Sequence, residues 1–401
     1  MSGTTPSLAE RMSHIGLSPT MKGTIAAERL RREGVDVVDL GAGEPDFPTP
    51  AHITAAAHKA LDANFTKYTA NMGTLELREA IGYRYREDYG VSYAPDEVIA
   101  AAGGKQALYH AAMTIFNPGD EVITHVPGWP TLIEQIKLAG ATPVVVRTSA
   151  AEGFALRADA LLAAVTPRTR AIIVNSPGNP TGALISESEA RTLAKEAARL
   201  GLWVIVDLCY EQLVYDHVPH NLPKIFGDAM REKLVLCGSA SKGYAMTGWR
   251  CGWVLGPTAV VSGCNALQSH ESSNVNSITQ KAAVAALTGP QDCVAEMRAI
   301  YIQRRNQVLE WLREEPRLVC PVPQGAFYLF PSIEAFLSPA GAPTSQAFTD
   351  GLLAKEHVVV TPAEAFESTG AFRLSYATSL ERLREGVTRI IRYARSLPLG
   401  K

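Results

Sequence analysis

Five charged side chains stand alone in stretches of the sequence that otherwise carry no charge. Residues 234–270 are 37 residues long, and the chain average of 19% charged residues predicts about seven ionic side chains there. The stretch holds two, Lys242 and Arg250. A cation among apolar residues is costly unless it meets a carboxylate or an anionic ligand. The other isolated charges are Lys105, Asp207 and Arg373.

Four of these five charges are positive, so together they would suit a ligand that carries a phosphate and carboxylates. They can meet only if the strands before them end at one edge of a parallel sheet, where open α/β sheets bind ligands. The alternative is that each charge pairs elsewhere or reaches solvent, which is the commoner arrangement for any single charged residue. For the five together we favour a site.

A strand and helix alternation between residues 95 and 260 predicts a mostly parallel, buried sheet. The apolar, β-branched runs expected as strands are 97–102, 120–124, 171–175, 202–207 and 234–237. The helical patterns between and after them include 106–116, 187–200 and 277–287. Ser186 is the expected N-cap of the second of these helices, with Glu189 as its capping-box partner.

The pattern changes after about residue 292. A charged helix (294–314), a Pro/Gly segment (321–325), a strand (326–330) and two further helices follow, which predicts a smaller α+β part. The predicted class is therefore α/β, with a large domain whose mostly parallel sheet has helices on both faces. We expect residues 1–50 to belong to the small domain, 51–291 to form the large domain, and 292–401 to complete the small one.

Composition excludes several classes of partner. The 38 Lys plus Arg against 40 Asp plus Glu leave a net charge of −2, so no basic field favours nucleic acid or an anionic membrane. The six cysteines include no C-x-x-C pair, which disfavours a zinc ribbon, a thioredoxin-like motif or a disulfide framework, and no metal site is predicted. No run approaches the roughly 18 apolar residues of a spanning helix. We expect a cytoplasmic protein.

Common phosphate and catalytic motifs do not fit. Asp46 stands where a dinucleotide fingerprint beginning at Gly41 needs its third glycine. Lys105 is followed by Gln106, not by the Ser or Thr of a P-loop, and His270-Glu271 has no second histidine at the spacing of a zinc protease. No G-x-S-x-G elbow occurs. Glycine-flanked turns and a lone lysine remain.

Nine short motifs, in one order along nearly the whole chain, resemble the fold type I aminotransferases that depend on pyridoxal 5'-phosphate (PLP), specifically the class I aspartate aminotransferase-like group. They are Gly41-Ala42-Gly43-Glu44-Pro45-Asp46-Phe47, Lys67-Tyr68-Thr69, Gly103-Gly104-Lys105-Gln106-Ala107-Leu108, Asn179-Pro180-Thr181-Gly182, Asp207 with Tyr210, Ser239-Ala240-Ser241-Lys242, Thr247-Gly248-Trp249-Arg250, Gly325-Ala326-Phe327-Tyr328 and Arg373-Leu374-Ser375-Tyr376-Ala377-Thr378-Ser379. The resemblance implies PLP as cofactor and ping-pong transfer of an amino group from an amino acid to a 2-oxo acid such as 2-oxoglutarate.

The resemblance gives catalytic roles to three residues. Lys242 would capture the cofactor aldehyde and later move a proton, helped by a neighbouring cation that lowers its pKa. Asp207 would pair with the pyridinium nitrogen and keep the ring an electron sink. Tyr210 would hydrogen-bond the ring's phenolic oxygen together with Asn179, which also lies at the substrate.

The resemblance also implies how the cofactor is held. Gly103, Gly104 and Lys105 open a helix whose free N–H groups and dipole bind phosphate. Ser239 and Arg250 would bind the same phosphate, and Trp129 would stack on the ring. Tyr68 and Ser273 resemble residues that reach a neighbouring subunit's phosphate, which implies a homodimer with shared active sites.

The implied substrate contacts point to an acidic amino donor. Arg373 would clamp the α-carboxylate, with Gly43 beside it. Lys105 and Thr20 are associated in this subgroup with a second, distal carboxylate, as in aspartate, glutamate or prephenate. Five residues depart from the family pattern, which weakens the prediction of an acidic amino donor: Gly128, Glu271, Ala363, Leu208 and Cys209.

Two alternatives remain open. A lyase, decarboxylase or synthase of the same fold would use the same cofactor but break another bond, and sequence does not determine which bond is broken. A non-catalytic PLP-binding sensor fused to a DNA-binding domain is disfavoured, because no residues are left for that domain.

Overall fold

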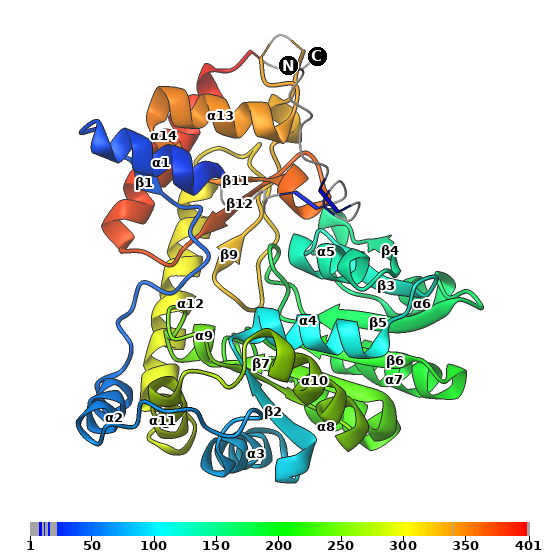
Figure 1. Ribbon diagram of the computed structural model, residues 1–401. Coiled ribbons are helices and arrows are strands. Elements are labelled where there is room, and N and C mark those ends of the chain that lie inside the picture. Colours follow the sequence, from blue (N-terminus) through cyan, green and yellow to red (C-terminus); the bar gives the residue numbers. More distant parts are fainter. Residues whose placement is uncertain (1–7, 10–11, 13–14, 17–21, 340, 399–401) are drawn as a thin grey trace, which may run out of the picture.

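The computed structural model describes residues 8–9, 12, 15–16, 22–339 and 341–398, and within them a sheet of seven strands forms the centre of the molecule (Figure 1). The strand order is β2-β8-β7-β6-β5-β3-β4. The strands are β2 (Val98–Ala101), β3 (Glu121–Val126), β4 (Thr142–Arg147), β5 (Thr169–Asn175), β6 (Trp203–Asp207), β7 (Leu234–Ser239) and β8 (Gly252–Leu255). β8 is antiparallel to both of its neighbours, β2 and β7, and the other neighbouring strands of this sheet pair in parallel. The predicted mostly parallel sheet is confirmed.

Side-chain alternation along the strands explains why both faces are buried. Along β6, Val204 and Val206 join one apolar cluster while Ile205 joins another, as the two-residue period of a strand requires. One cluster lies under α4 (Gly104–Ile115), α5 (Pro130–Leu138) and α10 (Thr258–Glu271). The opposite face is covered by α2 (Ala51–Asp62), α3 (Leu75–Tyr89), α6 (Ala158–Ala163), α7 (Glu187–Leu200), α8 (Leu222–Met230) and α11 (Ser277–Thr288).

A second, smaller part joins the two ends of the chain. β1 (Val38–Asp39) pairs in parallel with β10 (Val358–Val359), so the N-terminal segment lies beside the C-terminal part as predicted. A three-stranded antiparallel sheet has the order β11-β12-β9. The remaining elements here are α1 (Lys22–Arg32), β9 (Tyr328–Leu329), β11 (Thr361–Pro362), β12 (Phe372–Ser375), α13 (Ser345–Glu356) and α14 (Leu380–Ser396).

The long helix α12 (Asp292–Leu312) links the two parts, and Figure 1 shows it running from the level of α11 up to α14. Its first turns contribute Val294 to the core of the large part, whereas Tyr301 and the residues after it belong to the core of the small part. Tyr215, from the segment after β6, also packs in the small core. The boundary at residue 291 stays a prediction, because apolar contacts cross it.

Two local expectations differ from the structure. The expected strand 326–330 is only the two residues of β9. Ser186 caps α7 as predicted, accepting a hydrogen bond from the N–H of Glu189 at 3.2 Å. The Glu189 carboxylate does not close the capping box. It accepts from the N–H of Ala158 at 2.6 Å and so satisfies the start of α6 instead.

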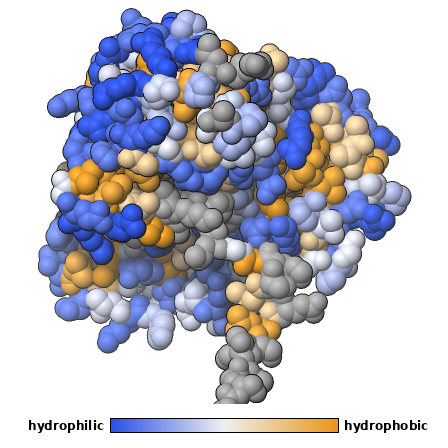
Figure 2. Space-filling view, turned by 90° about the horizontal axis from the view of Figure 1, so that it is seen from above, coloured by the Kyte–Doolittle hydropathy of each residue, from blue (hydrophilic) through white to orange (hydrophobic). Residues whose placement is uncertain are grey.

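The face of the molecule in Figure 2 is mostly hydrophilic, with hydrophobic side chains gathered in a few separate patches. Among the described residues, no helix combines the length and apolar character needed to cross a membrane. The same residues contain no group of three or more His, Cys, Asp or Glu side chains placed to hold a metal ion.

Candidate active site

A cavity of about 740 Å³ brings the five isolated charges together. It lies where β5, β6 and β7 end and α4 begins, because the carboxyl ends of parallel strands share one edge of a sheet. Its lining includes Lys105, Asp207, Lys242, Arg250 and Arg373. In the part of the chain that the structure describes, no ion pair involves any of the five. The expected convergence is therefore observed.

The five side chains differ in their access to water. Asp207 and Arg373 are buried, at 2% and 3% exposure, and Lys242 is half-buried. Lys105 and Arg250 are exposed, so the alternative in which a charge reaches solvent holds for these two.

Asp207 is a buried carboxylate that faces only neutral donors. It ends β6, opposite Asn175 at the end of β5. Its Oδ2 accepts from the side-chain amide of Asn175 at 2.9 Å, and its Oδ1 accepts from the N–H of Cys209 at 3.0 Å. Burial raises the pKa of Asp207 to about 6, and the Cys209 hydrogen bond opposes part of that rise. The site can therefore stabilise a cationic donor placed at this carboxylate.

Lys242 lies in the short helix α9 (Ala240–Gly243), which follows β7. Its Nζ donates to the carbonyl oxygen of Gly43 at 2.5 Å. Burial is the largest cause of its lowered pKa, and Arg373 and Arg250 lower it further. The neighbouring cation that the sequence predicted as the cause of this lowered pKa therefore contributes less than burial. A lowered pKa makes a neutral, nucleophilic amine more accessible.

The start of α4 forms a glycine-lined cradle in the same cavity as this amine. Gly103, with φ of 90°, precedes the helix, and a Cβ at this position would lie 2.6 Å from Nη2 of Arg250. Gly252 packs closely against this turn: a Cβ at position 252 would lie 2.5 Å from the backbone nitrogen of Gly104. The first N–H groups of a helix have no intrahelical acceptor, and they point with the helix dipole at any anion placed here.

Ser239 and Arg250 lie beside that cradle. The Ser239 hydroxyl donates to Ser241 Oγ at 2.8 Å and accepts from the N–H of Ser241 at 3.0 Å. Arg250 donates to the carbonyl oxygens of Thr247 and Ala102 at 3.0 and 3.2 Å. These contacts hold the guanidinium at the N-terminus of α4.

Arg373, on β12, brings a guanidinium from the small part into the cavity. Nη1 donates to Oδ1 of Asn179 at 3.0 Å, and Nη2 donates to the carbonyl oxygen of Gly41 at 2.7 Å. Its Nε is buried and meets no hydrogen-bond partner among the described residues, and the centre of the Tyr328 ring lies 4.4 Å from the guanidinium carbon. Arg373 is thus held in place with donors left for a carboxylate.

The remaining predicted residues fall into two groups. Gly43, Gly104, Trp129, Asn179, Tyr210 and Ser239 also line the cavity. Lys105 Nζ lies 5.3 Å from the centre of the Trp129 ring, and partial desolvation of this amine, together with the charge of Arg250, lowers the pKa of Lys105. Tyr68, 90% exposed, and Ser273, also exposed, do not line the cavity. Thr20 lies outside the described residues.

Several further residues line the cavity without having been assigned a role from sequence, among them Asn175, Cys209, Thr247 and Tyr328. Asn175 could have been found as the first polar residue after an apolar run. Tyr328 was within a matching motif, and its hydroxyl lies 2.7 Å from that of Tyr210. Burial raises the pKa of the Cys209 thiol to about 12, which makes it a poor nucleophile.

The departures from the family pattern have structural explanations. Glu271 was expected to add negative charge at the site, but its carboxylate lies 2.5 Å from Nε2 of the buried His110 and does not line the cavity. A Cβ at Gly128 would lie 2.3 Å from the carbonyl oxygen of His125, so this backbone accepts no larger residue. Leu208 and Ala363 are buried in apolar clusters.

Comparisons with known proteins agree with this geometry. The family model for aminotransferase class I and II matches residues 35–390. An aspartate aminotransferase from Geobacillus stearothermophilus is 40% identical, over 96% of this chain and 98% of its own. An aspartate/prephenate aminotransferase from Cereibacter sphaeroides is 41% identical, over 96% and 97%. The crystal structure of the aspartate aminotransferase from Rhizobium meliloti has a TM-score of 0.93 and 39% identity, covering 98% of this chain and all of its own.

We predict that Asp207 makes the cofactor-free protein less stable as the pH rises from about 4 to about 6. The folded pKa is about 6, above the value of about 3.9 for an unfolded chain, so the folded state binds the extra proton in this window. The full penalty, up to about 3 kcal/mol, is present above about pH 6. Calorimetry of the native chain and Asp207→Asn at about pH 4 and about pH 7 measures it. The variant should gain relative stability at the higher pH, and an unchanged difference contradicts the assignment.

Proposed function

We propose that this chain, which belongs to the class I and II aminotransferases, uses PLP to transfer the amino group of aspartate to a 2-oxo acid such as 2-oxoglutarate. Family membership makes it an aminotransferase, while the cofactor, the donor and the ping-pong order are the proposed part. One observation carries the proposal most: a buried carboxylate without a cationic partner, Asp207, lies in the same cavity as Lys242.

The residues present fit PLP at both of its ends. Asp207 meets two neutral donors, and the proton of a pyridinium ring would give it the cationic partner that it lacks. Gly103 leaves the N-terminus of α4 open to a phosphate, and Arg250 and Ser239 lie beside it. Trp129 also lines the cavity, where its indole would stack on the cofactor ring. When bound, PLP supplies an aldehyde that condenses with amines and a ring that accepts the electron pair leaving the substrate Cα.

The chain's own residues would then perform the proton and charge chemistry. Lys242 would hold the cofactor and, once displaced by the substrate amine, move a proton from the substrate Cα at its Nζ. Its lowered pKa supports both tasks, since each requires the neutral amine. Asp207 would keep the pyridine nitrogen protonated. Tyr210 and Asn179 would donate hydrogen bonds to the ring oxygen.

Arg373 is the proposed receptor for the substrate α-carboxylate. Its guanidinium is held by Asn179 and Gly41, and its Nε finds no partner in the part of the chain that the structure describes. A planar guanidinium binds a carboxylate through two parallel hydrogen bonds, which also orients the Cα–H bond of the substrate.

Aspartate is the proposed donor because Lys105 adds a further cation to the cavity. Lys105 Nζ lies over Trp129, and no carboxylate of the described chain is found paired with it. Glu271, which would have repelled a distal carboxylate, is directed at His110. Two relatives at about 40% identity are named for aspartate or aspartate and prephenate, which supports the same substrate class. Thr20 keeps its proposed role at the distal carboxylate.

We also propose that the active enzyme is a homodimer. Tyr68 and Ser273 are exposed and do not line the cavity of their own chain. Both are therefore free to reach the phosphate of a neighbouring subunit. We further propose domain boundaries at residues 50 and 291 and a cytoplasmic location.

Mixing the PLP-loaded protein with aspartate alone tests the proposed reaction. We expect one equivalent of oxaloacetate per site and an absorbance change to the amine form of the cofactor, with catalytic turnover only after 2-oxoglutarate is added. Release of pyruvate, ammonia or CO₂ would instead support a lyase or a decarboxylase and overturn the proposal.

Lys242→Ala should abolish multiple turnover, because it removes both the attachment point and the proton carrier. Borohydride reduction followed by mass spectrometry should attach the cofactor at residue 242 in the native chain and nowhere in the variant. Lys195→Ala, on the exposed side of α7, is the control and should retain native activity and labelling. Retained turnover in Lys242→Ala contradicts the assignment.

Lys105→Ser should weaken aspartate more than an apolar donor such as leucine, because it removes a cation from the substrate side of the cavity. We expect about a tenfold larger loss of kcat/KM for aspartate, as one charge-assisted hydrogen bond is worth roughly 1.5 kcal/mol. Lys137→Ser, at a surface ion pair with Glu134 on α5, is the matched control. Equal losses for both donors would refute an acidic pocket.

A further inference from the structure

One three-residue loop, Gly41–Gly43, contacts both cations that the proposed reaction depends on. The carbonyl oxygen of Gly41 accepts from Arg373 Nη2 at 2.7 Å, and that of Gly43 accepts from Lys242 Nζ at 2.5 Å. The loop follows β1 directly, so it extends from the small part into the cavity. Its position therefore affects the carboxylate receptor and the amine at once.

The side chain of Asp39 sets the conformation of this loop. Asp39 Oδ1 accepts from the N–H of Gly41 at 3.0 Å, two residues ahead, which is an Asx-type turn. Asp39 Oδ2 lies 3.3 Å from Nη2 of Arg31, on α1. The Asp39 side chain is 15% exposed, so water does not readily replace it as the acceptor. Opposite the turn, a Cβ at Gly41 would lie 3.1 Å from Val359 Cγ1, which leaves the loop little room to shift.

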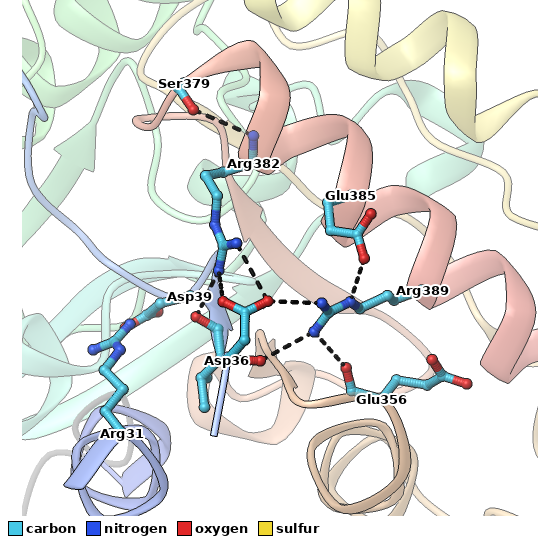
Figure 3. Close-up of polar contacts among 9 residues, drawn as sticks. Arg31, Asp36, Asp39, Glu356, Ser379, Arg382, Glu385 and Arg389 are labelled. Atoms are coloured by element: carbon cyan, nitrogen blue, oxygen red, sulfur yellow. Dashed lines mark hydrogen bonds and ion pairs between the residues drawn. The ribbon is translucent and has the colours of Figure 1, made fainter. Parts of the chain in front are cut away.

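The strand that carries Asp39 is itself fixed to the C-terminal helix. Figure 3 shows Asp36 between Arg382 and Arg389 of α14. The two guanidinium groups hold the pKa of Asp36 below its usual range. Arg382 also donates to the carbonyl oxygen of Val37 at 3.0 Å, and Arg389 donates to that of Asp36 at 3.1 Å. The backbone that leads into β1 is thus held at the carbonyl groups of Asp36 and Val37, shortly before Asp39.

We propose that Asp39 is a positioning residue for substrate binding, a role that rests on the proposed function of Arg373. Asp39 does not line the cavity and would not touch the substrate. It fixes the N–H of Gly41 and so restrains the backbone of this residue, whose carbonyl oxygen, in the next peptide unit, accepts from the guanidinium of Arg373. Asp39 thereby prepares the carboxylate receptor before the substrate arrives, which lowers the ordering cost of binding.

Asp39→Ala tests the inference in the PLP-loaded enzyme. We expect KM for aspartate to rise about five- to tenfold while kcat falls by less, because a lost hydrogen bond loosens the receptor without removing it. Calorimetric titration with succinate, a dicarboxylate that lacks an amino group, should show a similar loss of affinity. This second readout does not depend on turnover.

Two further variants of Asp39 distinguish the effect of its hydrogen bond to the Gly41 N–H from the effect of its negative charge. Asp39→Asn keeps an oxygen acceptor for the Gly41 N–H but loses the ion pair with Arg31, so it should restore near-native KM and succinate affinity. Asp39→Glu keeps the charge on a longer side chain that does not make the two-residue turn, and it should resemble Asp39→Ala. It also serves if the alanine variant does not fold.

Asp120→Ala is the control for a purely structural effect. Asp120 accepts a hydrogen bond from the N–H of Asn117 at 2.8 Å in a turn at the opposite end of β3 from the cavity. The inference is overturned if Asp39→Ala changes KM no more than Asp120→Ala, or if Asp39→Asn fails to restore binding. Arg373→Lys identifies the source of a failure: unchanged succinate affinity there would contradict the proposed role of Arg373 itself.

Discussion

The site is built around charges most of which have hydrogen-bond partners but none of which has an ion-pair partner among the described residues. Lys105, Lys242, Arg250 and Arg373 meet in one cavity with a single buried carboxylate, Asp207, and none of them forms an ion pair within the described chain. The burial of Asp207 and Arg373 and the partial burial of Lys242 cost stability, because these charges are removed from water without an opposite charge beside them. The shifted pKa values of Asp207 and Lys242 express this cost. A ligand with complementary charges recovers it as binding energy.

The fold supplies the two sides of that cavity from different parts of the chain. The parallel sheet places Asp207 at a strand end, Lys242 just after β7 and the N-terminus of α4 along one edge. The small part contributes Arg373 on β12 and the loop Gly41–Gly43 after β1. Any change in how the two parts pack therefore changes the distance between the guanidinium of Arg373 and the amine of Lys242.

Continuous apolar runs in the sequence predicted the central strands well. Where two segments offered alternative partners to one side chain, the sequence did not predict which partner it would bind. The apolar runs became the central strands because hydrophobic burial on both faces dominates there. The capping box at Ser186 failed because Glu189 met an unsatisfied N–H at the start of α6, which no local pattern reveals. Glu271 was misjudged for the same reason, since its partner His110 is 161 residues away in the chain.

The sequence by itself determined the chemistry available: which cations stand alone, which glycines open a helix, and which family the nine motifs match. Local composition carries this information because an isolated charge among apolar residues already implies an unusual environment. Only the tertiary structure decided which atoms meet. It showed burial as the main cause of the lowered pKa of Lys242, Asn179 and Gly41 as the partners of Arg373, and Asp39 as the support of the loop. Hydrogen bonds between distant segments depend on packing geometry, which the order of residues does not display.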